Sequence, residues 1–433
     1  MVSRVCSCSL VDLIPSSETE IGNPNLIAGR GSCMSSALAA SSVVSTAQLS
    51  PRIRPAVDRV EASKIAEVAM GHLDRPGLIP LWFGESDLTT PDFINQAATE
   101  ALARGETFYT HKRGIPELRD TLAGDMSGLY GRTSSSDRVS VTSSGMSAIM
   151  ITFQILVDAG EEVIIISPVW PNAALVVETL GGTPKFVTLD RRQDGGFSFD
   201  VEKVRAAIGP KTRAIFVASP GNPTGWTMSS QEQQQLLDVA RETGVWIVSD
   251  EVYARMVYDR KAAPSFLEIV EEDDPVIVVN SFSKSWAMTG WRLGWLTHPP
   301  MIDPAFDKLV EYNTSGAPTF LQYAGVTAIK EGEPFVASML ERCRKGRDLV
   351  IPALQSMGRV QVANPDASFY AFFHVNGAGD TLELARSLVE KSNVGLAPGN
   401  AFGPGGDGYL RLCFASSEET LSEAMDRLRP HLS

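Results

Sequence analysis

The sequence predicts an α/β protein in which helices cover both faces of a mostly parallel sheet, with a smaller α+β domain at the C-terminal end. Between residues 138 and 284, short apolar segments typical of strands alternate with segments typical of helices, as in a parallel sheet. After residue 380, a helix-like segment precedes short strand-like segments, which predicts the smaller domain. A length of 433 residues suits two or three such units.

The composition is that of a globular protein with a large core, because 43% of residues are hydrophobic and 21% are charged. The net charge of -13 opposes nonspecific binding to nucleic acid or to an anionic membrane, and no apolar run is long enough to span a bilayer. The five cysteines are scattered and odd in number, which favours a reduced protein without a zinc site. We therefore expect a cytoplasmic protein with no metal, no nucleic acid partner and no membrane association.

The first part of the chain differs in composition from the rest. Residues 1–50 are rich in serine and alanine and lack periodicity, so we expect a disordered extension. Whether residues 1–33 belong to the native protein stays open, because Met34 is an alternative start. We expect the remaining chain to form an N-terminal segment that packs on the small domain, a large domain and the small domain (51–88, 89–305 and 306–433).

The strand-like segments are short runs of valine, isoleucine and other apolar residues that end in polar or glycine-rich turns. We expect them at 79–83, 139–142, 162–166, 184–189, 213–218, 245–249, 275–280, 394–397 and 409–414. Helices are expected at 57–70, 91–104, 146–157, 172–180, 230–243 and 381–391. Ligands of parallel sheets bind beyond the carboxyl ends of the strands. That rule places several chemically useful residues on one rim: Gly145, Trp170, Asn222, Asp250, Tyr253 and Lys284.

Among the residues of this rim, Lys284 has the side chain with the most distinctive chemistry. It follows the buried strand at 275–280, among serines and aromatic residues. Desolvation there lowers the pKa of a lysine and frees its amine to attack a carbonyl, so Lys284 can hold an aldehyde cofactor as a Schiff base. The alternative is an ordinary solvated lysine in a strand-to-helix loop.

The neighbouring groups suit a phosphorylated pyridine. Gly145 and Met146 open a helix whose free N–H groups suit a phosphate. Asp250 suits a protonated ring nitrogen, which makes a pyridine an electron sink. Each residue alone also fits a structural role, such as a turn, a cap or core packing. Their convergence on one rim of the predicted sheet favours a cofactor site. The remaining candidates are Ser281, Ser283 and Arg292 for the phosphate, Trp170 for stacking on the ring, and Asn222 and Tyr253 for a ring oxygen.

From Leu81 to Arg427 the chain resembles the class I/II aminotransferases, which are pyridoxal-phosphate enzymes of fold type I. The motifs that carry the resemblance are Tyr109 with Gly114-Ile-Pro-Glu-Leu-Arg119, Asn222-Pro-Thr-Gly225, Asp250-Glu-Val-Tyr253, Ser281-x-Ser283-Lys284 with Arg292, and Arg411 in Tyr-Leu-Arg-Leu-Cys-Phe. The resemblance implies pyridoxal 5'-phosphate as cofactor and ping-pong transfer of an amino group from an L-amino acid to a 2-oxo acid. It also implies a homodimer, in which Tyr109 reaches the cofactor phosphate of the neighbouring subunit.

The resemblance also implies roles for individual residues. The catalytic residues would be Lys284, Asp250 and Tyr253. The cofactor would be bound by Gly145, Met146, Trp170, Asn222, Asp250, Tyr253, Ser281, Ser283, Lys284, Arg292 and Tyr109. The substrate would be bound by Arg411, Gly84 and Asn222, with Arg411 on the α-carboxylate. Alternation in the segment 409–414 independently places Arg411 on the face opposite Leu410 and Leu412.

Several alternatives remain open at this level. A C–S β-lyase or another fold type I enzyme would use the same Lys284. Similar bacterial aspartate aminotransferases often carry a lysine at the position of Met146, which weakens an aspartate assignment, and the amino donor and acceptor stay undetermined. A nicotinamide dehydrogenase is disfavoured, because the G-x-G-x-x-G at 403–408 precedes a strand instead of following one.

Overall fold

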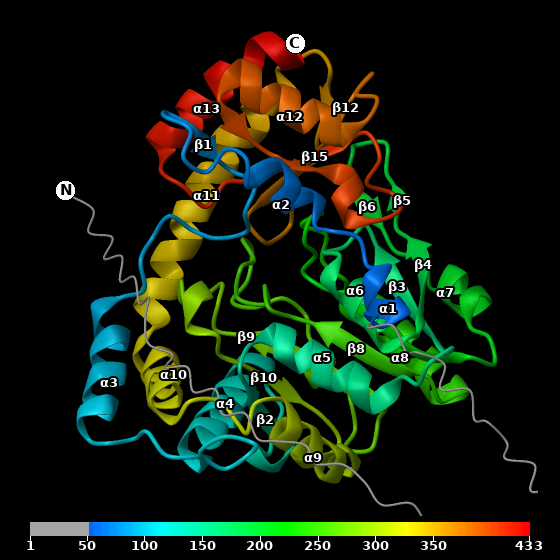
Figure 1. The fold of residues 1–433 in the computed structure, drawn as a ribbon, viewed down its shortest axis with the longest axis vertical. Coiled ribbons are helices and arrows are strands. Elements are labelled where there is room, and N and C mark those ends of the chain that lie inside the picture. Colours follow the sequence, from blue (N-terminus) through cyan, green and yellow to red (C-terminus); the bar gives the residue numbers. More distant parts are fainter. Residues whose placement is uncertain (1–51) are drawn as a thin grey trace, which may run out of the picture. The chain divides into compact units, whose positions relative to one another are not determined.

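The computed structural model describes residues 52–433, of which residues 53–433 form one compact unit (Figure 1). The predicted extension over residues 1–50 lies outside the described residues. Because 53–433 group together, the predicted domain bounds at 88 and 305 stay a prediction. Across the described part of the chain, no helix combines the length and apolarity needed to cross a membrane.

The large sheet is mostly parallel, as predicted. Within residues 52–433 it has seven strands in the order β2-β10-β9-β8-β7-β3-β4. The pairs from β9 to β4 are parallel, whereas β10 is antiparallel to β2 and β9. The sequence analysis does not predict β10, which begins at Gly294, and glycine is disfavoured in strands. The strands are β2 Val139–Thr142, β3 Glu162–Ser167, β4 Thr183–Thr188, β7 Thr212–Ala218, β8 Trp246–Asp250, β9 Val276–Ser281 and β10 Gly294–Thr297.

Helices cover both faces of this sheet because successive side chains of a strand point to opposite faces. Val163 and Ile165 of β3 belong to a core formed with α5, α6 and α9. Ile164 and Ile166 belong to the core on the other face, which includes residues of α7 and α8. A third cluster joins α3, α4 and α10 to β2 and β10. The helices are α3 Asp92–Ala103, α4 Pro116–Tyr130, α5 Gly145–Leu156, α6 Asn172–Leu180, α7 Val201–Ala207, α8 Ser230–Thr243, α9 Asp303–Asn313 and α10 Thr319–Glu331.

The C-terminal part contains a smaller antiparallel sheet with helices, which agrees with the predicted α+β character. Its strand order is β11-β12-β15-β14. Phe372 of β12 is opposite Arg411 of β15, and Tyr370 is opposite Cys413, so these four side chains share one face. The elements are β11 Val360–Gln361, β12 Tyr370–Val375, β14 Ala397–Pro398, β15 Tyr409–Cys413, α11 Glu333–Gln355, α12 Thr381–Ser392 and α13 Glu418–Leu432.

The segment before residue 89 differs from its prediction in one respect. The single helix expected over 57–70 is wrong, since α1 Pro55–Asp58 and α2 Lys64–Ala69 are separate helices. The hydroxyl of Ser63 accepts a hydrogen bond from the N–H of Ala66 and so caps a new helix start. Further along, β1 Ile79–Pro80 pairs in parallel with β13 Val394–Gly395, and β5 Asp190–Arg191 pairs with β6 Phe197–Ser198.

Candidate active site

A cavity of about 420 Å³ opens at the carboxyl ends of the parallel strands. Its wall is formed by the loops after β1, β3, β7, β8 and β9, by the first residues of α5, by residues of α2, and by β12 and β15 of the small sheet. The predicted site residues that line it are Gly84, Gly145, Met146, Trp170, Asn222, Asp250, Tyr253, Ser281, Ser283, Lys284, Arg292 and Arg411. Tyr109 does not line it, and its side chain is 92% exposed. Within residues 52–433, no cluster of histidine, cysteine and acidic residues could hold a metal ion.

Lys284 projects into the cavity from just beyond β9. Its Nζ donates a hydrogen bond of 2.6 Å to the carbonyl oxygen of Gly84, and it lies 5.8 Å from the centre of the Tyr253 ring. The pKa of Lys284 is lowered from 10.5 to about 8, chiefly by burial and also by the nearby charge of Arg411, while Cys413, Glu85 and Asp250 oppose the change. The neutral, nucleophilic amine is therefore more populated at physiological pH than in an exposed lysine.

Asp250 ends β8 on the same rim. Its carboxylate accepts a hydrogen bond of 3.2 Å from the N–H of Val252. The pKa of Asp250 is raised to about 6 because burial outweighs the opposing effects of that hydrogen bond and of the charge of Lys284. At neutral pH most of this carboxyl is still ionised, so it presents a negative charge that can stabilise a protonated ring nitrogen in the cavity.

Glu251, the next residue, is buried on the other side of the strand end and was not predicted to have a role. Its carboxylate accepts hydrogen bonds from the hydroxyls of Ser265 (2.6 Å) and Ser249 (3.0 Å). Burial is the main reason that its pKa rises to about 7. These bonds attach the loop at 265 to the end of β8, so Glu251 stabilises the position from which Asp250 enters the cavity.

Close packing around the start of α5 forms a cradle suited to an anion. A methyl group on Gly294 would lie 2.5 Å from the backbone nitrogen of Gly145, so β10 reaches the helix start only because it has glycine there. The Ser281 hydroxyl donates to that of Ser283 at 2.9 Å and accepts from the Ser283 N–H at 3.1 Å. Arg292 also lines the cavity, and its Nη1 donates a hydrogen bond to the carbonyl oxygen of Thr289. N–H groups, hydroxyls and a guanidinium together favour a phosphate.

Arg411 enters the cavity from the small sheet and is only 2% exposed. Its Nη1 donates to Oδ1 of Asn222 at 2.8 Å and its Nη2 donates to the carbonyl oxygen of Trp82. Its Nε is buried and, among residues 52–433, has no hydrogen-bond partner. In the described part of the chain its partners are an amide and a carbonyl oxygen, so this buried guanidinium is suited to bind an anionic ligand such as a carboxylate.

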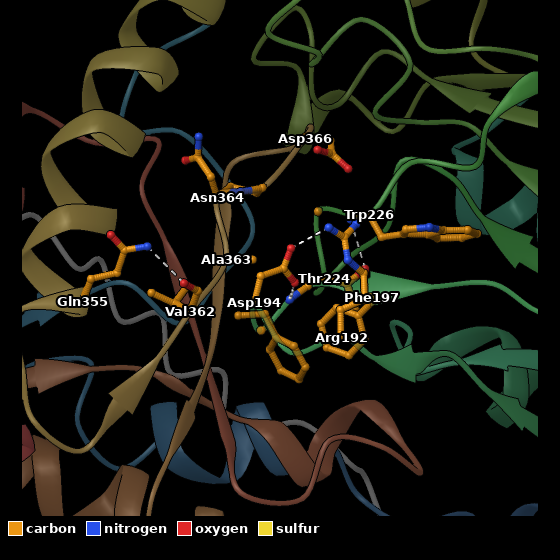
Figure 2. Close-up of a pocket in the computed structure, with 15 residues that line it drawn as sticks. Arg192, Asp194, Phe197, Thr224, Trp226, Gln355, Val362, Ala363, Asn364 and Asp366 are labelled. Carbon is orange, nitrogen blue, oxygen red and sulfur yellow. Dashed lines mark hydrogen bonds and ion pairs between the residues drawn. The ribbon is translucent and has the colours of Figure 1, made fainter.

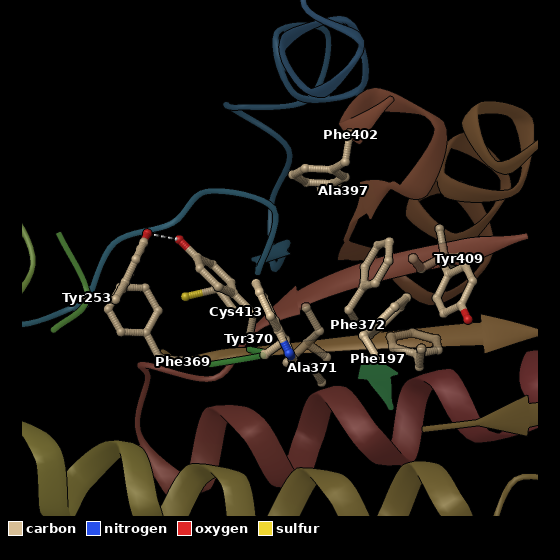
Figure 3. Packing of buried hydrophobic residues seen from close by; sticks show 14 of the residues in the cluster. Phe197, Tyr253, Phe369, Tyr370, Ala371, Phe372, Ala397, Phe402, Tyr409 and Cys413 are labelled. Atoms are coloured by element: carbon tan, nitrogen blue, oxygen red, sulfur yellow. Dashed lines mark hydrogen bonds between the residues drawn. The ribbon is translucent and has the colours of Figure 1, made fainter. Parts of the chain in front are cut away.

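Tyr370 is a site residue that sequence reasoning missed. It lines the cavity from the first position of β12, and its hydroxyl lies 2.6 Å from that of Tyr253 (Figure 3). Its ring also lies under the guanidinium of Arg411. The sequence analysis places no strand at 370–375, so it misses β12 as well as Tyr370, and no local pattern signals which residues these side chains meet.

A second cavity, of about 270 Å³, lies between β6 and the segment 362–366 (Figure 2). Arg192 and Asp194 at its wall form an ion pair with each other. Burial raises the pKa of Asp366, which also lines this cavity. The predicted site residues all line the first cavity except Tyr109, so we assign the chemistry to the first.

Comparisons with known proteins identify the family of the chain. The chain matches the family "Aminotransferase class I and II" over residues 77–428. It is 33% identical to an aspartate aminotransferase of Pyrococcus horikoshii over 86% of this chain and 95% of that protein. It is also 33% identical to aromatic-amino-acid aminotransferase 2 of Thermococcus litoralis, with the same coverage. The solved aspartate aminotransferase of Thermus thermophilus with maleate superposes with a TM-score of 0.82 at 32% identity, covering 88% of this chain and all of that one.

Together the fold and the cavity define an α/β protein with a lysine of lowered pKa and a buried carboxylate at the mouth of a parallel sheet. The family match then fixes the class. The chain belongs to the class I and II aminotransferases, and it is an aminotransferase.

Proposed function

We propose that the chain binds pyridoxal 5'-phosphate in the first cavity and transfers an amino group from an amino acid to a 2-oxo acid in two half-reactions. The observation that carries this proposal is the presence of the Lys284 amine and the Asp250 carboxylate in one buried cavity, beside the anion cradle at the start of α5. When bound, this cofactor supplies an electron sink that stabilises negative charge at the α-carbon of the substrate.

The residues present fit this cofactor. The cradle at Gly145 would hold its phosphate, with the hydroxyls of Ser281 and Ser283 and the guanidinium of Arg292. Lys284 would hold its aldehyde carbon and, once released, would move the proton at the α-carbon of the substrate. Asp250 would keep the ring nitrogen protonated. The remaining ring contacts would come from Trp170 on its face and from Asn222 and Tyr253 on its oxygen.

Arg411 is proposed to bind the α-carboxylate of the substrate. Its guanidinium is oriented by Asn222 and Trp82, and its buried Nε is available to a ligand. Gly84 lines the same cavity, and its carbonyl oxygen accepts a hydrogen bond from the Lys284 amine. A bidentate carboxylate on Arg411 would therefore place the α-amino group of the substrate near the Lys284 amine.

The wall left for the substrate side chain is uncharged and its larger side chains are mostly apolar. It includes Ile65, Phe83, Met146 and Ile149, with the polar residues Ser63, Asn172 and Thr289. The three cations that line the cavity, Lys284, Arg292 and Arg411, are assigned to the aldehyde, the phosphate and the α-carboxylate. Because no cation among the described lining residues remains for a second carboxylate, we propose that the substrates are amino acids and 2-oxo acids with uncharged, apolar side chains.

A homodimer is proposed from the exposed aromatic residues near the Tyr109 loop. Phe108, Tyr109 and Tyr312 are 84%, 92% and 80% exposed, and Thr319 donates a hydrogen bond to the carbonyl oxygen of Phe108. Large exposed aromatic residues are favoured at protein interfaces. Burial of this group by a second copy would let Tyr109 reach the other cavity. A cytoplasmic location is also proposed, because Cys343 and Cys413 are free thiols.

The test is a panel of amino donors with pyruvate and with 2-oxoglutarate, together with the absorbance spectrum of the purified protein. We expect absorbance from the bound cofactor in the wild type, and loss of both this band and turnover in Lys284→Ala. The matched control is Lys345→Ala, which removes an exposed lysine and should change neither. Leucine, methionine or phenylalanine should exceed aspartate as donors.

Three outcomes would contradict parts of this proposal. Ammonia released from a cysteine conjugate without any acceptor, at a rate above amino transfer, would favour a lyase. Aspartate as the best donor would refute the apolar side-chain class and leave amino transfer in place. A monomer in light scattering, with the cofactor bound and active, would refute the shared site.

A further inference from the structure

We propose that Tyr370 is a positioning residue that links the substrate end of the cavity to the cofactor end: its hydroxyl orients Tyr253, and its ring supports Arg411. This inference rests on the proposed function, in which Arg411 binds the α-carboxylate and Tyr253 binds the ring oxygen of the cofactor. Tyr370 and Tyr253 are both buried, at 0% and 3% exposure, and both line the cavity.

The hydroxyl contact determines what Tyr253 can do. The two hydroxyl oxygens are 2.6 Å apart, and the two rings meet edge to face (Figure 3). A phenol has one proton to donate, so one hydroxyl of the pair donates and the other accepts. When Tyr370 donates, the proton of Tyr253 is available to a third group in the cavity, and the accepted bond makes Tyr253 a stronger donor. Tyr370 thus aims and strengthens the hydrogen bond that Tyr253 gives to the cofactor oxygen.

The ring contact acts on the other partner. The guanidinium carbon of Arg411 lies 4.5 Å from the centre of the Tyr370 ring and 4.9 Å from that of Phe402. A guanidinium over an aromatic face is attracted to it, most strongly where water is excluded. Arg411 is therefore held by two rings as well as by its bonds to Asn222 and Trp82. Of the two rings, the Tyr370 ring also carries a hydroxyl that reaches Tyr253.

Gly84 provides the space that the Tyr370 hydroxyl occupies. A methyl group at position 84 would lie 1.9 Å from the hydroxyl oxygen and 3.0 Å from the ring carbon that bears it. The carbonyl oxygen of the same residue accepts the hydrogen bond from Lys284. Tyr370 is thus packed against the backbone group that also holds the reactive amine, which fixes its hydroxyl relative to both Tyr253 and Lys284.

The test is Tyr370→Phe, which keeps the ring under Arg411 and removes the hydroxyl. The readout is the pH midpoint of the absorbance change of the bound cofactor. Without the Tyr370 hydroxyl, Tyr253 is a weaker donor to the ring oxygen of the cofactor, so more negative charge stays on that oxygen. This charge favours the protonated form of the nearby Lys284 nitrogen that would hold the cofactor, so the midpoint should move to higher pH by about half a unit. The KM for the amino donor should stay within about twofold, because the cation–π contact remains. Tyr370→Leu, which lacks the ring as well, should raise KM by about tenfold in addition.

Two control variants separate positioning from general loss of packing. Phe402→Leu removes the other ring near Arg411, so KM should rise while the midpoint stays at the wild-type value. Tyr258→Phe removes a buried phenol hydroxyl that is bonded to the carbonyl oxygen of Ser368, away from the cavity lining, and should change neither quantity.

The outcomes of this experiment are distinguishable. A Tyr370→Phe protein with the wild-type midpoint would overturn the inference, as would a midpoint shift of equal size in Tyr258→Phe. A wild-type chain that takes up no cofactor would overturn the proposed function and this inference with it, and the wild-type spectrum alone identifies that case.

Discussion

Replacing Lys284 with methionine should stabilise the cofactor-free protein at neutral pH, because the amine is charged there in a site that disfavours its charge. Burial lowers the pKa of Lys284 from 10.5 to about 8, which corresponds to about 3 kcal/mol of destabilisation of the ammonium form. Solvent at the partly buried side chain, and loss of the 2.6 Å hydrogen bond to Gly84, reduce the expected gain to about 1–2 kcal/mol. For a chain of this size the melting temperature should rise by about 1–3 °C.

The pH dependence gives the sharper test. The pKa of Lys284 is lower in the folded state than in the unfolded state, so the unfolded chain binds more protons between pH 8 and 10.5. Wild-type stability should therefore increase, relative to that of Lys284→Met, as the pH rises through this window. Below pH 8 the extra stability of Lys284→Met over the wild type is at its full value. Above pH 10.5 the two proteins differ only by the hydrogen bond to Gly84 that the variant lacks.

Thermal and urea unfolding of both proteins, stripped of small molecules and at equal concentration, measures this difference from pH 7 to pH 10.5. Lys345→Met is the matched control, because Lys345 is exposed and pairs loosely with Glu418 at 3.8 Å. A variant at position 284 that is less stable than wild type at pH 7, or a stability difference that does not change with pH, would refute the assigned burial of the charge.

Further variants test the other parts of the site. Asp250→Asn should keep the fold but lower kcat by about 10²–10³-fold, because the neutral amide no longer stabilises a protonated ring nitrogen; steady-state kinetics measure this, and wild-type turnover would contradict it. Arg411→Lys should raise the KM for the amino donor by about 10²-fold, since an ammonium cannot bind a carboxylate through a planar fork, and an unchanged KM would remove Arg411 from substrate binding. Met146→Lys should increase the use of aspartate while Met146→Leu should not; no gain with lysine would show that position 146 does not meet the side chain. Arg113→Ala should reduce stability by about 2–4 kcal/mol in urea unfolding, because its buried guanidinium binds Ser140 and Asp303, and a change below 1 kcal/mol would contradict this.

Much of the fold and of the site could be predicted because the signal is local. Strands of a parallel sheet that is covered on both faces are continuous apolar runs, and a loop must follow each of them. Asp250 ends one such strand and Lys284 lies just beyond the end of its parallel neighbour, so strand direction alone brings them to one rim. The short helices α1 and α2 were misjudged as one, because the apolar spacing continues through 59–63 while the cap at Ser63 decides the break.

The amino-acid sequence by itself determined the alternation of strands and helices, the rim where their loops meet, and the types of charged group found there. Only the tertiary structure decided which of those groups touch. Arg411 meets Asn222, Lys284 meets Gly84, and Tyr370 meets Tyr253, each across more than a hundred residues of chain. The physical reason is that such contacts depend on how the small sheet packs against the large one and on the space left by Gly84. Neither feature produces a periodic pattern in the amino-acid sequence.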